Sequence, residues 1–406
     1  MKFLILGILA MAAYNGISQG HASVEQAIAQ ALENNASMKA SNFELESQKQ
    51  LRKTSFNLPK TEITLLYGQY NSYIKNDNNV TISQAIPFSA LGSQGSLNRA
   101  LVTSSEIKKR VDKNEIVHQV KQLYHQLAFT NSRYQLLLRQ DSIYEGFLKS
   151  ASLRYQTGET NLLEQTTAEG QWNESKNQLR QMETEISRLK MRLRTITNSQ
   201  SFPEIELTVL SLEEELDTLG YKTNPSLAFI RQQIEVSYRE MKLQAARFAP
   251  DLLIGFFSQT LIGGPVSETG NAATSNDRFT GFQVGIALPL WFAPHQARVK
   301  SADFKRKADE SRFEYYQTSL QGQLQQAIRE LSTYKISLEY YTTSGIPNAG
   351  RILKQSQVAF REGEIGYTEY LSGLRNAMSI QEGYLKTLND YNQSILYIEY
   401  LNGNHL

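Results

Sequence analysis

The fold of this chain is decided by a short stretch that occurs twice, as LRYQTGETNLLE at Leu153–Glu164 and as VAFREGEIGYTEYL at Val358–Leu371. In each copy a glycine interrupts a helical pattern, and a second residue that tolerates positive φ follows three residues later. Each copy therefore predicts a reversal of direction at the tip of a helical hairpin. An offset of 205 residues aligns Tyr155 with Phe360, Gly158 with Gly363, Glu159 with Glu364, Asn161 with Gly366 and Glu164 with Glu369.

The sequence around both copies predicts long helices. Proline is absent from 88–202 and from 348–406, and a proline inside a helix costs about 3 kcal/mol. Apolar residues recur there at steps of three, four or seven, which is typical of coiled-coil seams, although ordinary bundle helices explain any one seam. The three seams are Val117, Val120, Tyr124, Leu127, Tyr134 and Leu138; Leu179, Met182, Ile186, Leu189, Leu193 and Ile196; and Leu371, Leu374, Met378, Leu385, Leu388 and Ile395.

Three further pairs of segments repeat outside the long helices. TISQAIPF at 81–88 resembles GIALPLWF at 285–292, LPKTEITLLYGQY at 58–70 resembles APDLLIGFFSQTL at 249–261, and NASM at 35–38 resembles NPSL at 224–227. The order helix, strand, strand, long helix, tip, helix therefore occurs twice, which indicates an internal duplication of roughly 190 to 205 residues.

The duplication sets the expected domain organisation. We expect a signal peptide at 1–19, cleaved between Ser18 and His21, because its apolar run is too short to span a bilayer. The first repeat would occupy 20–218, with a helix, a strand pair at 60–88 and long helices at 96–197. The second would occupy 219–406, with a helix, a strand pair at 250–290 and long helices at 297–402.

The expected strands have two different faces. Phe282, Val284, Ile286 and Leu288 alternate with small or polar residues. Strands of about 9 to 11 residues with this pattern suit a transmembrane β-barrel in which those four side chains face lipid, although a soluble sandwich gives the same alternation. Four strands cannot close a barrel in lipid, because open edges are not tolerated there, so membrane insertion would require several copies of the chain.

Composition excludes several other functions. The 42 Lys and Arg against 40 Asp and Glu leave almost no net charge, and no basic run predicts a nucleic-acid partner. The absence of Cys excludes disulfides and thiolate sites, and no catalytic motif indicates an enzyme or a cofactor. His118 and His125 are seven residues apart, about two helical turns, too far to chelate one ion, so we expect a structural role for them and no metal site.

The duplicated unit resembles the TolC family of outer-membrane efflux proteins. The resemblance rests on RYQTG and FREGE at the tips, NPSL at the start of the second half, and a strand that ends in LPLWF. It implies a mainly α fold with four strands per protomer, in which a homotrimer forms a 12-stranded transmembrane β-barrel continued by a periplasmic α-barrel of coiled-coil helices. A periplasmic adaptor (membrane fusion) protein, an inner-membrane pump of the RND type and outer-membrane lipid would be the partners.

The resemblance also implies roles for individual residues. Glu369, with Glu164 as its counterpart, corresponds to an acidic residue of the periplasmic constriction, whereas a solvated helix carboxylate is the alternative. Ile365 and Ser372 stand where a basic and a second acidic gating residue would be expected, so that gating arrangement is in doubt. The tip residues that would dock adaptor and pump are Tyr155, Gly158, Glu159, Phe360, Gly363, Glu364 and Gly366.

Within the family, RFTGFQVGIALPLWFAPHQARVKSA at 278–302 most resembles outer-membrane components of Czc-type and Cus-type heavy-metal efflux systems. The expected function is therefore passive export of heavy-metal cations across the outer membrane of a Gram-negative-type envelope. A channel for multidrug efflux or for type I protein secretion is the alternative, because the same ducts serve all of these pumps. A periplasmic adaptor would share the heptads and the export signal, but not the strand pairs.

Overall fold

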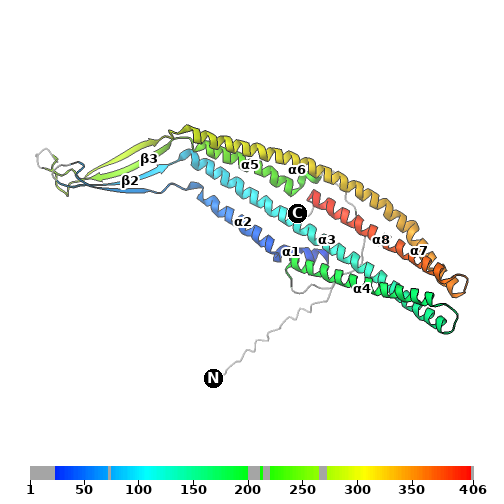
Figure 1. The fold of residues 1–406 in the computed structure, drawn as a ribbon. Coiled ribbons are helices and arrows are strands. Elements are labelled where there is room, and N and C mark those ends of the chain that lie inside the picture. The colour runs from blue at the N-terminus through cyan, green and yellow to red at the C-terminus, as the bar shows by residue number, and fades with distance from the viewer. Residues whose placement is uncertain (1–22, 72–74, 200–210, 214–219, 265–271, 404–406) are drawn as a thin grey trace, which may run out of the picture.

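The structure is a computed structural model that describes residues 23–71, 75–199, 211–213, 220–264 and 272–403 (Figure 1). The expected signal peptide at 1–19 and the expected boundary between the repeats at 218 and 219 lie outside these ranges. No helix of the described ranges is both long enough and apolar enough to cross a membrane.

The secondary structure follows the duplicated order. The first half contains α1 (Val24–Asn34), α2 (Ala36–Lys53), the 3-10 turn η1 (Thr54–Phe56), β1 (Glu62–Gly68), β2 (Asp77–Ile86), α3 (Phe88–Gln156) and α4 (Leu162–Thr197). The second half contains the 3-10 turn η2 (Gly220–Thr223), α5 (Pro225–Ala246), β3 (Asp251–Gln259), β4 (Phe279–Ala287), α6 (Phe292–Tyr340), the π-helical turn η3 (Tyr341–Gly345), α7 (Ile346–Arg361) and α8 (Tyr367–Asn402). The predicted fold class, mainly helical with two strand pairs and a doubled order, is confirmed.

Both strand pairs join one antiparallel sheet in the order β1-β2-β3-β4. The middle pair joins the two halves of the chain, with Ile82 opposite Phe256 and Ile86 opposite Leu252. The long helices begin at Phe88 and Phe292, earlier than the expected starts at 96 and 297, because few residues separate each of them from the preceding strand. The sheet and the helices therefore form one continuous elongated body (Figure 1).

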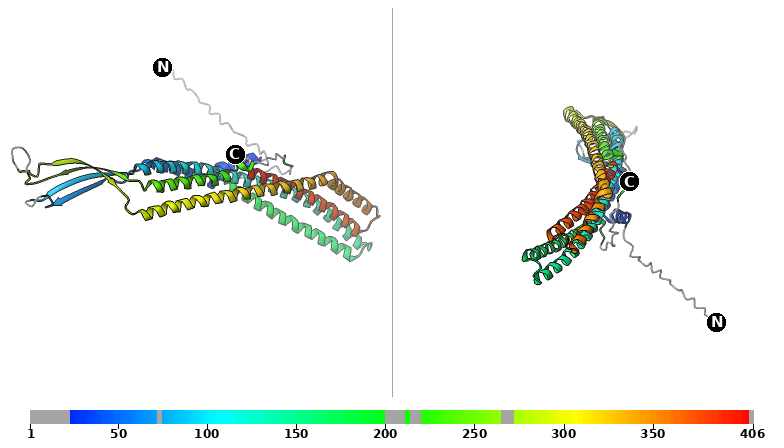
Figure 2. Two further views of the ribbon diagram at one scale, coloured as in Figure 1. Left: turned by 90° about the horizontal axis from the view of Figure 1, so that it is seen from above. Right: turned by 90° about the vertical axis from the view of Figure 1, so that its right-hand side faces the viewer.

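The helices form a single curved layer. Near the sheet, α3 packs against α2 and α5, and α5 packs against α6; near the tips, α3 packs against α4 and α8, and α8 packs against α7. The two further views show that the layer is bent across its width, and Figure 1 looks at its concave side (Figure 2). Since α3 has 69 residues, it is about 100 Å long.

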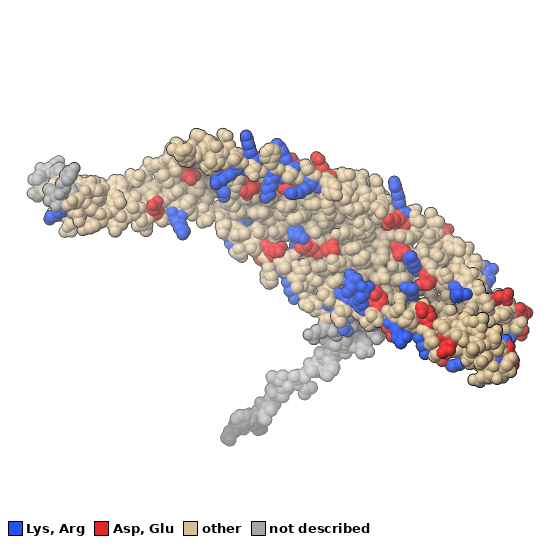
Figure 3. All heavy atoms as spheres, viewed as in Figure 1, with Lys and Arg blue, Asp and Glu red and all other residues tan. Residues whose placement is uncertain are grey.

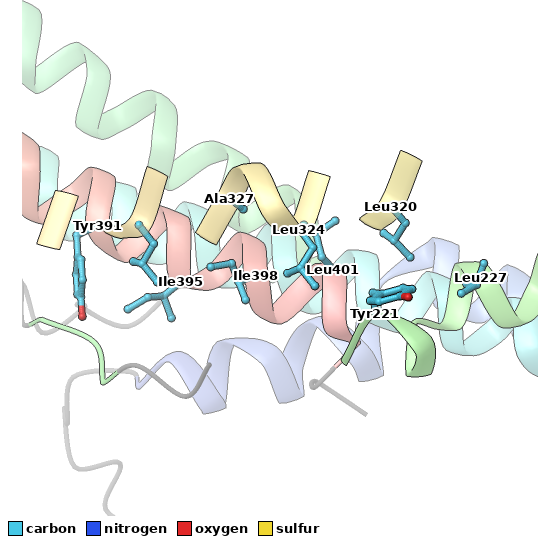
Figure 4. Close-up of a cluster of buried hydrophobic side chains, with 10 residues drawn as sticks. Tyr221, Leu227, Leu320, Leu324, Ala327, Tyr391, Ile395, Ile398 and Leu401 are labelled. Atoms are coloured by element: carbon cyan, nitrogen blue, oxygen red, sulfur yellow. The ribbon is translucent and has the colours of Figure 1, made fainter. Parts of the chain in front are cut away.

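Each repeat contributes a matching core where its helices meet. The core of the first repeat includes Ile116, Val120, Leu123 and Leu127 of α3, and that of the second includes Leu320, Leu324, Ala327 and Leu331 of α6 (Figure 4). These positions correspond one to one at an offset of 204 residues. The predicted seams supply much of this core, including Leu189, Leu193 and Ile395, whereas Leu138 of the first seam is 38% exposed and does not belong to it.

The π-helical turn η3 accounts for a change of offset between the repeats. The offset is 204 in the cores but 205 at the tips, so the second repeat has one additional residue between them. A π-helical turn accommodates an extra residue inside a continuous helix. Tyr341 of η3 packs against Gly345 and Gly383, where a Cβ atom would approach its ring to 2.9 Å and its hydroxyl oxygen to 2.4 Å.

Asn35 and Asn224 join corresponding helix ends in the two repeats. The side-chain oxygen of Asn35 accepts from the Ser37 N–H (2.8 Å), and its amide donates to the Ile196 carbonyl near the end of α4 (2.9 Å). The oxygen of Asn224 likewise accepts from the Ser226 N–H (2.8 Å), and its amide donates to the Leu401 carbonyl near the end of α8 (2.9 Å). The matched NASM and NPSL segments are therefore helix caps that also close each repeat on itself.

Replacement of Asn224 tests this closure. Asn224 is 2% exposed, so Asn224→Ala should lower the free energy of unfolding by about 1 to 3 kcal/mol, because it removes a cap and leaves a buried carbonyl without its donor. Asn224→Asp keeps the cap acceptor but places a buried carboxylate oxygen against the Leu401 carbonyl in place of the amide donor, so it should also lower the stability. Denaturant unfolding followed by circular dichroism measures both; unchanged stability of Asn224→Ala would contradict the assignment.

Candidate functional site

One face of the sheet is apolar across all four strands. Residues that are directly paired lie on the same face, and the register therefore places Phe282, Val284 and Ile286 beside apolar residues of the other strands. These are Ile63, Leu65 and Tyr67 of β1, Val80, Ile82 and Ile86 of β2, and Leu252, Ile254 and Phe256 of β3. The polar residues of this face are Gln84, whose amide donates to the Pro59 and Ala85 carbonyls, and Asn78, Ser258 and Thr280.

The four side chains expected to face lipid belong to this apolar face or continue it. Phe282 is 86% exposed and Val284 75%, and Ile286 and Leu288 are also exposed. Leu288 follows the last residue of β4. The opposite face of the sheet is mostly small or polar, with Leu66, Leu253, Phe257 and Phe279 as its large apolar residues; its other members include Thr64, Asn79, Thr81, Ser83, Gly255, Gln259, Gly281, Gln283 and Gly285. One face therefore suits hydrocarbon and the other suits water.

Both lateral edges of the protomer are open in the part of the chain that the structure describes. β1 and β4 each pair with one strand only, so each presents a row of unpaired backbone N–H and C=O groups. The flanking helices also expose large apolar side chains, including Phe43 on α2 and Phe304 and Tyr315 on α6. A wall with two open edges of this kind is suited to side-by-side association with further copies.

The two hairpin tips have the same backbone geometry. Gly158 has a φ of +79° and Gly363 a φ of +77°. The N–H of Gly158 donates to the Tyr155 carbonyl and that of Glu159 to the Arg154 carbonyl, and the equivalent bonds join Gly363 to Phe360 and Glu364 to Ala359. The predicted reversals are therefore glycine-terminated helix ends of the Schellman type.

The prediction that Asn161 and Gly366 contribute positive φ to the reversals is wrong. Asn161 has a φ of −96° and Gly366 a φ of −78°, so neither adopts positive φ. Both are N-cap residues: the Asn161 side chain accepts from the N–H of Glu164 (3.0 Å), and the N–H of Gly366 donates to the Glu369 carboxylate (3.1 Å). The spacing from each tip glycine marks the start of the returning helix, which requires extended backbone at the cap.

The two candidate carboxylates have different surroundings. Glu164 pairs with Arg154 at 3.3 Å, also accepts from the Thr160 hydroxyl, and has a side chain only 15% exposed. Glu369 is exposed, and its carboxylate accepts a hydrogen bond from the Gly366 N–H at the start of α8. Of the two, Glu369 is the carboxylate accessible to solvent near the tips.

Aromatic side chains join the two hairpins near their tips. Phe147 of α3 stacks on Tyr367 of α8 with ring centroids 4.3 Å apart, which joins the two hairpins. Within the second hairpin, Phe360 of α7 stacks on Tyr370 of α8 at 4.8 Å. Burial first, and then the Glu164 carboxylate, raise the pKa of Tyr367 to about 12, so its hydroxyl stays protonated at neutral pH. Phe147, Tyr367 and Tyr370 could not be predicted from the sequence, because the contacts of Phe147 with the two tyrosines cross between the repeats and leave no local spacing signal.

A groove of about 760 Å³ lies between the tips. Arg154 and Glu164 line it from the first hairpin, and Gly363, Glu364 and Gly366 line it from the second. Tyr155 is 41% exposed beside the first turn, and Glu159 lies 3.9 Å from Arg154. Five of the nine predicted tip and constriction residues therefore line this groove, namely Glu164, Phe360, Gly363, Glu364 and Gly366.

The histidines of α3 pack against aromatic rings. His118 stacks on Tyr400 at 4.6 Å, and His125 lies edge-on to Tyr124 at 5.9 Å. Burial is the main cause that lowers the pKa of both imidazoles, so both are neutral at pH 7. Within the ranges that the structure describes, no three His, Asp or Glu side chains gather as a metal site would require.

No protein-family model and no curated protein matches this sequence. Solved structures do match its fold. CusC, reported in a study of folding and transmembrane channel formation, is 14% identical with a TM-score of 0.75, over 93% of this chain and 91% of CusC. The CmeC outer-membrane channel of Campylobacter jejuni is 13% identical with a TM-score of 0.79, over 94% and 86%. The outer-membrane protein VceC of Vibrio cholerae is 12% identical with a TM-score of 0.76, over 94% and 96%.

These similarities cover almost the whole chain on both sides of each comparison. The chain therefore has the fold of the TolC-type outer-membrane channels, as the resemblance implies. The sequence identities are low, so this conclusion concerns the fold alone, and the role of the chain is argued from its own surfaces.

Substitution at the second tip tests the turn geometry. Gly363→Val forces a β-branched residue to positive φ, although open space surrounds the position, and should destabilise the turn by about 1 to 2 kcal/mol or more. The amides of Glu364 and Ile365, which donate to the Ala359 carbonyl, should then exchange hydrogen faster. Gly366→Ser is the matched control, because its φ of −78° suits any residue. Unchanged amide exchange in Gly363→Val would contradict this account.

Proposed function

We propose that this chain is the outer-membrane exit duct of a tripartite efflux system and that it conducts substrates passively, without catalysis or a cofactor. The observation that carries this proposal is the two-faced sheet, apolar on one side and mostly polar on the other, which continues into a curved layer of long helices. An apolar outer face with a polar inner face is the arrangement of transmembrane β-barrels. The helical layer would carry the duct across the periplasm of a Gram-negative-type envelope.

Three copies of the chain would complete the duct. Each copy supplies four strands with two open edges, and open edges are not tolerated in lipid. A homotrimer pairs β4 of one copy with β1 of the next, which gives a closed barrel of twelve strands with its apolar face toward outer-membrane lipid. The same rotation closes the helical layers into an α-barrel whose lining is their concave face.

The hairpin tips, at the end of the body opposite the sheet (Figure 1), would dock the partner proteins. In a trimer, six tips surround the periplasmic mouth, and each protomer offers the groove between its own two tips. Tyr155, Gly158, Glu159, Phe360, Gly363, Glu364 and Gly366 are the proposed contact residues for a periplasmic adaptor and an inner-membrane pump of the RND type.

The cargo proposed first is a heavy-metal cation, on the strength of the resemblance of 278–302 to Czc-type and Cus-type components. A passive duct needs no metal ligands of its own. Multidrug efflux and type I protein secretion are the alternatives. CusC, CmeC and VceC match this chain with similar TM-scores, so similarity of fold does not distinguish one cargo from another.

The proposed function is tested in a strain that lacks the gene. We expect loss of tolerance to Co, Zn, Cd, Cu or Ag salts, or to dyes and antibiotics, with recovery when the gene is restored. Selective metal sensitivity would support cation export, and sensitivity confined to organic compounds would assign a drug pump. Full tolerance to both panels, together with normal protein secretion, would contradict a role as an exit duct.

Glu369 is proposed as the acidic constriction residue, with Glu164 held in its ion pair behind it. Threefold symmetry would gather three exposed Glu369 carboxylates, and a carboxylate ring favours cations. Glu369→Gln should therefore lower the cation-to-anion permeability ratio several-fold in planar-bilayer recordings, and it should retain the cap on Gly366 through the amide oxygen. An unchanged ratio would remove Glu369 from the conduction path.

A further inference from the structure

A second groove lies at the opposite end of the helical layer, close to the sheet. It has a volume of about 600 Å³ and is lined by residues of α3, α5 and α6. α5 lies between α3 and α6 and packs against both. The layer curves so that α3 and α6 come forward on either side of α5 (Figure 2), and the groove lined by all three helices lies over α5 on that side. That is the concave side, where Lys and Arg side chains gather over α5 and α6 (Figure 3).

Three cationic side chains, Arg247, Arg298 and Lys305, line this sheet-proximal groove. Within the described residues, none of the three side chains forms an ion pair or a hydrogen bond. Glu240 is the one carboxylate of the lining, and it accepts from the amide of Gln244 (2.6 Å) and lies beyond ion-pair distance of all three cations. The groove therefore has a net charge of +2.

Several other cations of α5 and α6 are paired with carboxylates, whereas the three that line the groove are not. Arg306 pairs with Asp303 at 2.9 Å and also with Glu310, Lys307 pairs with Asp303 at 2.9 Å, and Arg312 pairs with Asp309 at 2.7 Å. On α5, Arg239 pairs with Glu235 at 2.6 Å. Arg231, Lys242, Lys300 and Arg329 also have no ion pair among the described residues, but they do not line the groove. The groove is therefore distinguished by three unpaired cations that converge on one hollow.

The duplication shows that these charges are specific to one repeat. α3 and α6 both begin with Phe, at Phe88 and Phe292, so the offset of 204 holds from their first residues. At that offset, Arg298 corresponds to Gln94 and Lys305 to Leu101. The helix surface of the first repeat thus has the same shape without either cation, and so the fold itself does not require them.

The remaining surface of the groove is suited to a carbon skeleton. Leu97 and Leu101 of α3, Val236 of α5 and Ala302 of α6 contribute apolar surface beside the three cations. Arginine binds carboxylate and phosphate groups in bidentate fashion, and lysine adds a compact positive charge. An apolar wall with a few convergent polar groups is typical of small-molecule sites.

We propose that this groove binds an organic anion, that is, a compound with a phosphate, sulfonate or carboxylate group attached to an apolar part. The link to cargo rests on the proposed function, since the concave face becomes the wall of the duct only when the ring closes. Three copies would then place nine unpaired cations around one level of the duct.

Binding is measured on the purified full-length trimer in detergent, with a trisulfonated pyrene dye as the probe and fluorescence anisotropy as the readout. We expect saturable binding that weakens as salt rises, because exposed charges are screened. The triple variant Arg247→Gln, Arg298→Gln, Lys305→Gln should raise the dissociation constant at least tenfold. Absence of saturable binding, or equal affinity in the variant, would overturn the proposal.

The chain provides a matched control with the same change in charge. Arg306→Gln, Lys307→Gln, Arg312→Gln removes three cations of α6 that do not line the groove, and it should leave the affinity unchanged. A loss as large as that of the groove variant would overturn the proposal, because net charge alone would then explain binding. Size-exclusion elution and thermal unfolding verify that both variants remain folded trimers.

Competition experiments identify the source of the anionic group. Displacement of the dye by inorganic phosphate supports a soluble anion, and displacement only by phosphatidylglycerol micelles supports a lipid headgroup; displacement by neither would overturn the proposal. The test is independent of export. If the purified protein binds the dye but the deletion strain keeps its tolerance, the anion site is supported and the role as an exit duct is rejected. If the deletion strain is sensitive but the protein does not bind the dye, the exit duct is supported and the anion site is rejected.

Discussion

A wall that is one element thick has no interior of its own, and the rest of this structure depends on that constraint. Each helix buries its apolar residues against the helices beside it, so the core is divided into seams such as the one formed by Leu324, Leu331 and Ile395. Among the residues that the structure describes, no second layer covers the sheet, so one face stays apolar and exposed, with Phe282 at 86%. Both edges also remain open. In the proposed duct, lipid would cover the apolar face and further copies of the chain would pair with the edges.

The two repeats share their backbone geometry closely, but they differ in the surroundings of their charged side chains. Backbone features repeat closely: positive φ at Gly158 and Gly363, and a cap at Asn35 and Asn224 that also binds a distant carbonyl. The surroundings and positions of charged side chains repeat less closely. Glu164 is held by Arg154, whereas its counterpart Glu369 is exposed, and the cations at Arg298 and Lys305 have no counterpart in α3. Geometry is constrained by the shared fold, and charge is free to take separate roles in each half.

Charge is therefore distributed unevenly along the proposed duct. The tip groove contains Arg154, Arg361, Glu164 and Glu364, and the exposed Glu369 lies in the first turn of α8. The sheet-proximal groove has a surplus of unpaired cations. A solute that passes from the tips to the sheet would meet these surroundings in turn. Neither net charge nor composition reveals this, because the totals of 42 basic and 40 acidic residues nearly cancel over the whole chain.

The sequence by itself determined the duplicated order, the four strands, the long helices and the glycine turns, because periodicity, proline placement and glycine at positive φ are local properties. Only the tertiary structure decided that β2 pairs with β3, that Phe147 stacks on Tyr367, and that Asn161 and Gly366 are caps. It also decided which charges are free: Arg298 and Arg306 look alike in sequence, but only Arg306 has carboxylates within reach. Pairing between distant segments depends on their arrangement in space, and local spacing does not encode it.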